Sequence, residues 1–185
     1  WLSELAVGAE SGNLGKKVSS LSDGNRMKLM ISGVLARDTK LLLMDEPASP
    51  LDPLMRDKLC EIIRDYLLEE EGERSVFFST HNIADMENVT DYAIIMAHGT
   101  IVEAGFVEDL KEKYVLVKGE PDDISCASNV LFSMHSNKYG YEGICLSEKL
   151  DQLAGCDISV ETPSLSQISV AVMKNYSRLQ DRRNA

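Results

Sequence analysis

Two short apolar runs, each followed at once by polar residues, most constrain what this chain can fold into. Residues 41–44 read Leu-Leu-Leu-Met and lead into Asp45-Glu46, and residues 76–79 read Val-Phe-Phe-Ser and lead into Thr80-His81. Continuous apolar runs of this length are typical of strands that are buried on both faces of a parallel sheet. We therefore predict two buried parallel strands whose carboxyl ends carry chemically useful side chains.

The segment between these strands has the pattern of an amphipathic helix. Over residues 54–70, apolar side chains recur on one helical face and charged side chains occupy the rest. Strand, helix and strand form a βαβ unit, whose crossover is almost always right-handed. In open α/β sheets, functional groups gather beyond the carboxyl ends of the strands. Topology alone therefore predicts that Asp45, Glu46 and His81 meet at one edge of the sheet.

A further helix is predicted before the first strand, over residues 22–36, where apolar residues recur with a period of 3.6. Ser22 suits its N-cap. The residues around this start, Leu21-Ser22-Asp23-Gly24-Asn25, could bind phosphate, because backbone amides at a helix start, a hydroxyl and a glycine allow close approach. Taken alone, this pentapeptide is more often a capped helix that follows a loop.

The acidic pair and the histidine each have a chemical and a structural interpretation. An aspartate after such a strand holds Mg²⁺ in P-loop ATPases, and an adjacent glutamate can polarise an attacking water. The alternative is a solvated acidic loop. His81 could contact the γ-phosphate of a nucleotide, although a lone histidine is more often structural. Asp52 by itself indicates only a helix start, and His98 and His135 have only a structural interpretation.

From about residue 107 the pattern changes to that of a small α+β appendage. Before it we predict a short helix at 82–89 and strands at 91–97 and 100–104. Within it we predict a helix at 108–114, a strand at 115–117, a hairpin of 131–135 with 141–146, a helix at 147–153 and a strand at 156–160. A last helix is expected to open at Thr162-Pro163, with Pro163 at its first helical position.

Charge and cysteine usage narrow the function classes. The net charge of −11 argues against nucleic acid and anionic lipid as direct partners. No run approaches the roughly 18 apolar residues of a membrane-spanning helix, so a membrane role is expected to run through a partner. The four cysteines, Cys60, Cys126, Cys145 and Cys156, form no CxxC pair, and we interpret them as free thiols rather than a disulfide framework or a zinc site.

The order and spacing of these features resemble the second half of the nucleotide-binding domain of ABC transporters, over residues 15–113. Residues 21–25 resemble the signature motif, 41–46 the Walker B strand, 49–52 the D-loop and 79–81 the switch-histidine loop. Residues 114–176 resemble the accessory domain of bacterial exporters of the bacitracin and lantibiotic-resistance type. The resemblance implies an ATPase subunit with ATP and Mg²⁺ as its cofactors.

The resemblance also implies roles for individual residues. Asp45 would position Mg²⁺, Glu46 would activate water and His81 would report the γ-phosphate. Ser22, Gly24 and Asn25 would contact ATP held by a second ABC ATPase domain, in a homodimer or heterodimer, and Asp52 would couple the two sites. A membrane permease would be the other partner, placing the subunit in the cytoplasm on the inner face of the membrane, where it would power the export of an amphiphile.

The expected fold class is α/β. It combines the parallel sheet of a P-loop NTPase without its P-loop half, residues 1–113, with an accessory α+β domain, residues 114–185. No G-x-x-x-x-G-K-[ST] occurs, so we expect a fragment that is inactive alone. Where the family has Gly-Gly-Gln, this chain has Asp23-Gly24-Asn25, and Asp23 is expected to face away from the nucleotide.

Two alternatives stay open at this point. One is a soluble ABC ATPase without a permease, acting in translation or DNA repair; the acidic charge and the lack of a coiled-coil insertion between residues 46 and 81 weigh against the DNA-repair kind. The other is a truncated, non-enzymatic module that regulates a transporter, against which Glu46 and His81 argue.

Overall fold

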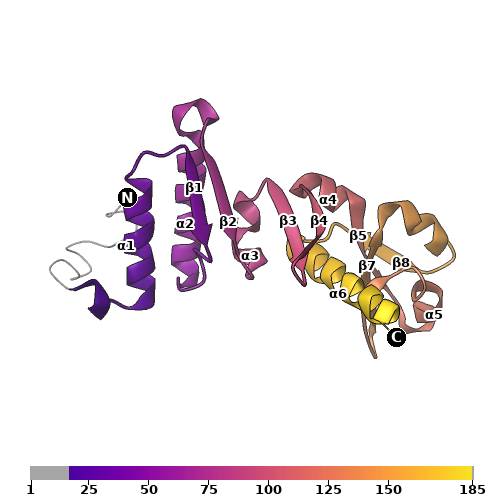
Figure 1. Cartoon of the computed structure of the whole chain (residues 1–185). Helices are drawn as coiled ribbons and strands as arrows, with labels where there is room; N and C mark the ends of the chain where they lie inside the picture. The colour runs from indigo at the N-terminus through magenta and orange to yellow at the C-terminus, as the bar shows by residue number, and fades with distance from the viewer. Residues whose placement is uncertain (1–16, 185) are drawn as a thin grey trace. The chain divides into compact units, whose positions relative to one another are not determined.

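A computed structural model of the chain describes residues 17–184. It divides into two compact units, with the boundary in the sequence between Val89 and Thr90 (Figure 1). The first unit contains, in chain order, η2 (Val18–Ser20), α1 (Asp23–Leu35), β1 (Leu41–Asp45), α2 (Pro53–Leu68), η3 (Glu69–Gly72), β2 (Ser75–Ser79), α3 (Ile83–Met86) and η4 (Glu87–Val89). The functional boundary expected between residues 113 and 114 stays a prediction.

The first unit is a βαβ unit with α1 before it and α3 after it. β1 and β2 pair in parallel, and α2 is the crossover between them. Both α1 and α2 pack on one face of this pair, because alternate strand residues such as Leu42 and Phe78 join the apolar faces of the helices in one core. The fully buried members of that core from α2 are Leu59, Ile62, Ile63 and Tyr66. The opposite face of the pair presents Leu41, Leu43 and Phe77, which are exposed.

The second unit is built around antiparallel strands. Its elements are β3 (Tyr92–Ala97), β4 (Thr100–Phe106), α4 (Val107–Lys113), β5 (Tyr114–Gly119), η5 (Pro121–Asp123), α5 (Ile124–Ala127), β6 (Phe132–Asn137), β7 (Gly140–Leu146), η6 (Ser147–Leu153), β8 (Ile158–Glu161) and α6 (Leu165–Asn184). β3 and β4 form a hairpin, and the order β6-β7-β5-β8 forms a four-stranded sheet. α6 contacts β3 and β6.

The start of α6 differs from the sequence-based prediction. The helix begins at Leu165, so Pro163 lies before it and not at its first position. The helix begins there because Ser164 and Gln167 cap each other. The Ser164 hydroxyl accepts a hydrogen bond from the Gln167 amide at 3.2 Å, and the Gln167 side chain accepts one from the Ser164 amide at 2.9 Å. This reciprocal capping satisfies two amides at the helix start and fixes where the helix begins.

The interpretation of all four cysteines as free thiols was wrong for one pair. Cys126 and Cys156 form a disulfide, with their Cα atoms 6.6 Å apart, whereas Cys60 and Cys145 are buried free thiols. α5, which carries Cys126, follows β5, and the segment that carries Cys156 leads into β8. Because β5 and β8 are neighbours in the sheet, the two cysteines meet across 30 residues of sequence.

Candidate active site

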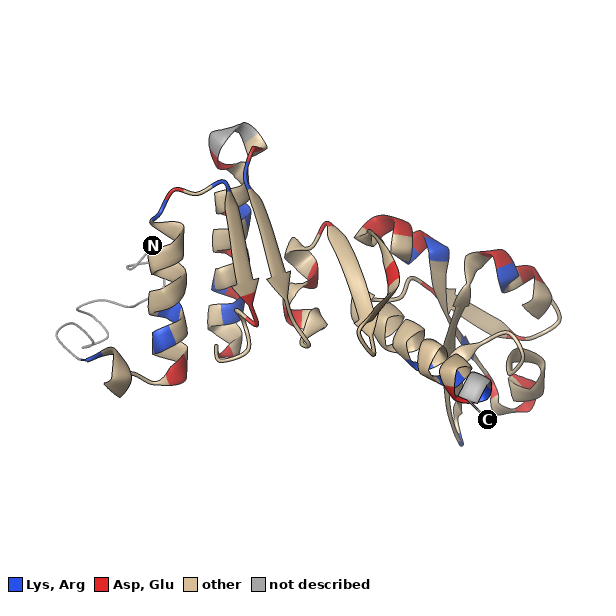
Figure 2. Cartoon of the chain, in the orientation of Figure 1, with Lys and Arg blue, Asp and Glu red and all other residues tan. Residues whose placement is uncertain are grey.

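The register of the parallel pair decides which side chains meet at its carboxyl edge. Asp45, the last residue of β1, lies opposite Ser79, the last residue of β2. The Glu46 amide donates to the Ser79 carbonyl at 3.0 Å, so the pairing continues for one more step. Residues 45–46 and 79–81 therefore share one edge, where Figure 2 shows acidic residues in red at the end of β1.

Glu46 and His81 contact each other directly. His81 Nδ1 lies 2.6 Å from Glu46 Oε1, and the His81 amide donates to the same oxygen at 2.8 Å. Thr80 Oγ1 donates to the other carboxylate oxygen at 3.3 Å. Because an ionised carboxylate only accepts hydrogen bonds, Nδ1 carries the proton in this contact. Nε2 is then the ring nitrogen that remains for a ligand.

The surroundings keep the Glu46 carboxyl group ionised. Burial acts to raise the pKa of Glu46, but the hydrogen bonds and charge of His81, together with the Thr80 hydroxyl, outweigh burial and hold the pKa below its ordinary value. The side chain is one-third exposed. At neutral pH it is therefore an accessible hydrogen-bond acceptor for water rather than an acid.

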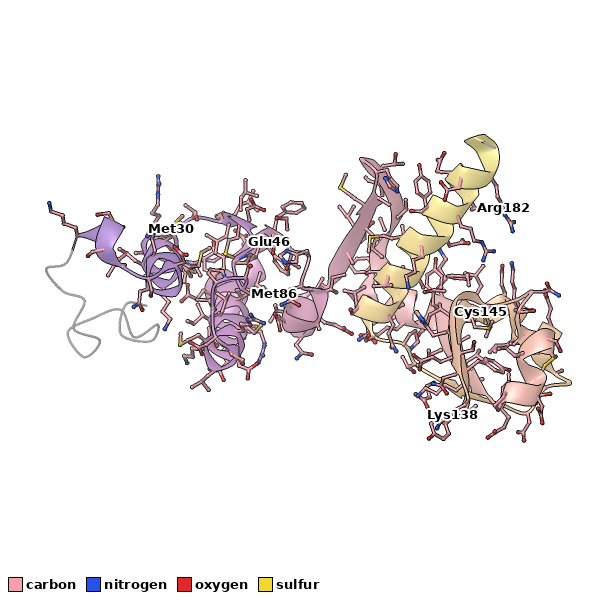
Figure 3. The ribbon with its side chains drawn as sticks, turned by 90° about the horizontal axis from the view of Figure 1, so that it is seen from below. Met30, Glu46, Met86, Lys138, Cys145 and Arg182 are labelled. Carbon is pink, nitrogen blue, oxygen red and sulfur yellow. A yellow bond between two sulfur atoms is a disulfide. The ribbon has the colours of Figure 1, made fainter. Side chains whose placement is uncertain are left out.

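The backbone of Glu46 is strained, with φ at +49°. A residue with a Cβ adopts this left-handed conformation at a cost of about 1–3 kcal/mol, and it persists where the surroundings fix it. Here the Ser79 carbonyl holds the amide, and the Glu46 carbonyl accepts the Ser49 amide at 3.2 Å. Glu46, labelled in Figure 3, thereby leaves β1 with its carboxylate accepting the His81 amide, just beyond the end of β2.

Asp45 lies beside this contact and has the chemistry of a magnesium ligand. Its side chain accepts a hydrogen bond from the Ser79 hydroxyl, and the residue is exposed. Among residues 17–184, no group of three or more His, Cys, Asp or Glu side chains could hold a metal unaided. Mg²⁺ commonly uses one or two carboxylates and completes its shell with water and substrate phosphates. A single exposed aspartate fits that ion in a nucleotide complex.

Ser22, Gly24 and Asn25 lie in the first turn of α1, beside the turn that contains Asp52. The Ser22 hydroxyl accepts the Asn25 amide at 3.4 Å and caps the helix. A Cβ on residue 24 would lie 2.9 Å from the Pro50 carbonyl oxygen, so only glycine allows this close approach. Asp52 in turn caps α2, because its carboxylate accepts the amide of the third helical residue at 3.0 Å.

Asp23, His98 and His135 make local contacts within their own units. Asp23 is highly exposed and lies 3.3 Å from Arg26 Nη1, which offsets its charge. His98 and His135 belong to the second unit: His98 Nε2 lies 3.1 Å from the Ser177 hydroxyl, and His135 Nε2 lies 3.3 Å from Lys174 Nζ. Their structural interpretation from the sequence is consistent with these contacts.

Three polar residues near the site have no individual role predicted from the sequence. They are Ser79, whose hydroxyl contacts Asp45, and the pair Arg56 and Asp85, whose Nη1 and Oδ2 atoms are 2.6 Å apart. Ser79 could have been found from its position at a strand end. The Arg56–Asp85 ion pair could not be predicted from the sequence. Arg56 is one charge among several on its helix, Asp85 lies in a short helix, and such residues are usually exposed to solvent.

A parallel βαβ unit with an aspartate, a glutamate and a histidine at its carboxyl edge belongs to the class of α/β folds used by P-loop-type NTPases. No established protein-family profile matches the chain. The energy-coupling factor transporter ATP-binding protein EcfA2 of Enterococcus faecalis is 28% identical over 148 residues, which span 80% of this chain and 50% of that protein. The phosphate import ATP-binding protein PstB 2 of Listeria monocytogenes is 36% identical over 98 residues, 53% of this chain and 35% of that protein.

The solved structures point to the same class. A structure described as the ATP-binding subunit of an ABC transporter aligns with 59% of this chain and 44% of its own, with 26% identity and a TM-score of 0.50. These relatives and this neighbour are ATP-binding subunits of ABC transporters, and the chain spans half of their length or less. The expected α/β fold class is confirmed, whereas the bacitracin and lantibiotic-exporter subgroup stays a prediction.

Within the part of the chain that the structure describes, no helix combines the length and the apolar character that a membrane span needs.

Proposed function

We propose that this chain is part of the ATP-binding and ATP-hydrolysing subunit of an ABC transporter. The observation that carries the proposal is the contact between Glu46 and His81 at the carboxyl edge of a parallel pair, next to the exposed Asp45. The similarity to ATP-binding subunits supports it. The net charge of −11 favours partners other than nucleic acid.

In the proposed reaction, Glu46 accepts a hydrogen bond from the water that attacks the γ-phosphorus of ATP. The water oxygen bonds to phosphorus while the bond to the bridging oxygen breaks, ADP leaves, and Glu46 receives the water proton. His81, whose Nδ1 proton is held by Glu46, presents Nε2 to the γ-phosphate and responds to its loss. Asp45 would hold Mg²⁺, which neutralises phosphate charge when bound.

One face of the β1–β2 pair is left exposed by the described residues, which is an argument for a further layer of structure over it. Leu43 and Phe77 are 69% and 58% exposed there, although parallel sheets are normally covered on both faces. We propose that polypeptide carrying the phosphate-binding loop covers this face, since no such loop occurs in the sequence. On this proposal the 185-residue chain is a fragment and hydrolyses no ATP alone.

The proposed assembly contains two ATPase domains and a permease. The first turn of α1, with Ser22, Gly24 and Asn25, would bind ATP held by the second domain, because a helix start favours phosphate. Asp52 would couple the two sites, since its turn contacts Gly24 through Pro50. The subunit would lie on the cytoplasmic face of the membrane. Because the Listeria relative is named for phosphate import, export is a separate proposal, resting on the resemblance of residues 114–176 to an exporter accessory domain.

The test uses the complete polypeptide that contains this chain. We expect it to release phosphate from ATP with a turnover of about 1 s⁻¹ or faster, and to stop when EDTA removes Mg²⁺. The 185-residue chain, assayed in parallel, is expected to be inactive. Absence of Mg²⁺-dependent hydrolysis by the complete polypeptide would contradict the proposed function, and brisk hydrolysis by the chain alone would contradict its fragment status.

A further inference from the structure

The first turns of α2 hold two segments of the candidate site at once. Asp52 caps this helix, so the turn over residues 49–52 is attached to its start. On the other side, α3, which follows His81, packs against α2. The Met86 side chain is fully buried in the shared core, and Cys60 Sγ lies 3.3 Å from the Asp85 carbonyl oxygen. Both segments therefore contact the same helix, α2.

Arg56 is the side chain that touches both segments. Its Nε donates to the Leu51 carbonyl at 2.9 Å, within the 49–52 turn. Its Nη1 donates to Asp85 Oδ2 at 2.6 Å, within α3. The two charged side chains are 25% and 23% exposed, so solvent screens this pair less than a surface ion pair. Arginine suits the position because its planar fork offers separate donors to two acceptors.

A continuous set of hydrogen bonds leads from this pair to Glu46. The Asn82 side chain donates to the Asp85 carboxylate that also accepts from Arg56. The Asn82 amide donates to Thr80 Oγ1 at 3.0 Å, and that hydroxyl donates to Glu46 Oε2 at 3.3 Å. Every residue of the set is at least partly buried. The position of the Glu46 carboxylate is thereby linked to the turn that carries Asp52.

We propose that Arg56, through Asp85, is a positioning residue that couples the Asp52 turn to the Glu46–His81 contact. The inference rests on the proposed ATPase function. When Arg56 no longer joins the Leu51 carbonyl to Asp85, the segment over residues 80–82 moves relative to the 49–52 turn. Glu46 and His81 then lose their alignment. Misplacement of about 1 Å at a reacting centre costs up to about a hundredfold in rate. ATP affinity changes little, because most phosphate contacts are proposed to come from the phosphate-binding loop and from the first turn of α1 of the second domain.

The experiment compares Arg56→Lys and Asp85→Asn in the complete polypeptide with the parent. Lysine keeps the charge but replaces the planar fork, whose Nε and Nη1 serve the Leu51 carbonyl and Asp85 separately, with a single ammonium nitrogen, so the two-point contact is lost. We expect kcat for ATP to fall about tenfold in both variants, with KM changed less than about twofold. Hydrogen exchange of the His81 and Asn82 amides, which donate to Glu46 and Thr80, is expected to become several-fold faster.

Glu61→Gln is the matched control, because it removes an ion pair of 3.0 Å with Lys58 on the exposed side of the same helix. It should leave kcat, KM and exchange at parent values. Unchanged kcat in Arg56→Lys and Asp85→Asn overturns the inference, and so does a lowered kcat with unchanged exchange at residues 81–82. An inactive parent contradicts the proposed function instead, and the exchange measurement then still decides whether Arg56 holds this segment.

Discussion

The Glu46 carboxylate lies 2.6 Å from Nδ1 of His81, a residue 35 positions away in the sequence. The parallel register of β1 and β2 makes this contact possible, because it pairs the last residue of β1, Asp45, with the last residue of β2, Ser79. The strained φ of Glu46 then keeps the carboxylate at the end of the neighbouring strand. The first prediction follows from the ionisation of this group.

Folding stability should depend on Glu46 as the pH falls. Because its folded-state pKa lies below the ordinary value of about 4.3, ionised Glu46 stabilises the fold above that pH. This contribution is lost as the pH falls through the folded pKa. The parent should therefore lose more stability than Glu46→Gln between neutral pH and pH about 3, as measured by urea unfolding at each pH. Parallel curves for the two proteins would show that the contact with His81 does not form in solution.

Two glycines of α1 should respond in opposite ways to alanine. Gly24→Ala places a methyl group 2.9 Å from the Pro50 carbonyl oxygen and should lower the free energy of unfolding by about 1–2 kcal/mol. Gly33→Ala meets no atom within 4 Å and should raise it by up to about 1 kcal/mol, because alanine favours the helix. Denaturant unfolding of both variants is the measurement. Equal effects would show that the start of α1 does not touch the 49–52 turn.

In the second unit, the hydrogen bond from the Tyr114 hydroxyl to Glu103 should contribute to folding stability. That hydroxyl and Lys113 Nζ each donate to Glu103 Oε2 at 2.5 Å, and the glutamate side chain is only 14% exposed. Burial, followed by the nearby Glu103, raises the pKa of Tyr114 above its ordinary value. Tyr114→Phe should cost about 1–3 kcal/mol of unfolding free energy, because a buried carboxylate loses a donor. Tyr139→Phe, at an exposed position, is the control and should cost little. Equal costs would contradict the buried hydrogen bond.

Reduction should weaken the second unit. The disulfide between Cys126 and Cys156 closes a loop of 30 residues, which on chain-entropy grounds stabilises the fold by about 3.5 kcal/mol. Thermal unfolding with and without dithiothreitol should therefore show a lower Tm in the reduced state. The Cys126→Ser, Cys156→Ser double variant should have the Tm of the reduced parent, and dithiothreitol should not change it. A parent whose Tm is the same in both conditions would indicate that the bond does not form.

The features that could be predicted from the sequence depend on local patterns. The strands around Leu42 and Val76 follow from apolar runs, and the caps at Ser22 and Asp52 from single residues at helix starts. The meeting of Glu46 with His81 could also be anticipated, because parallel topology alone brings strand ends together.

Other features depend on contacts between distant segments whose residues carry no distinctive local pattern. Arg56 and Asp85 are 29 positions apart, and each looks like an ordinary surface charge until α3 packs on α2. Cys126 and Cys156 are separated by 30 residues and become neighbours only through the β5–β8 pairing. The start of α6 was misplaced because the capping pair Ser164 and Gln167 outweighs the preference of proline for the first helical position.

ATP turnover by Glu46→Gln in the complete polypeptide, measured together with ATP binding, shows whether the Glu46 carboxylate activates the attacking water. Removing the carboxylate that accepts the water proton should slow hydrolysis by about a hundredfold or more, while the variant still binds ATP like the parent. Glu61→Gln, the exposed control on α2, should retain full turnover. A Glu46→Gln variant that hydrolyses ATP at the parent rate would contradict the role assigned to Glu46 and the site built around it.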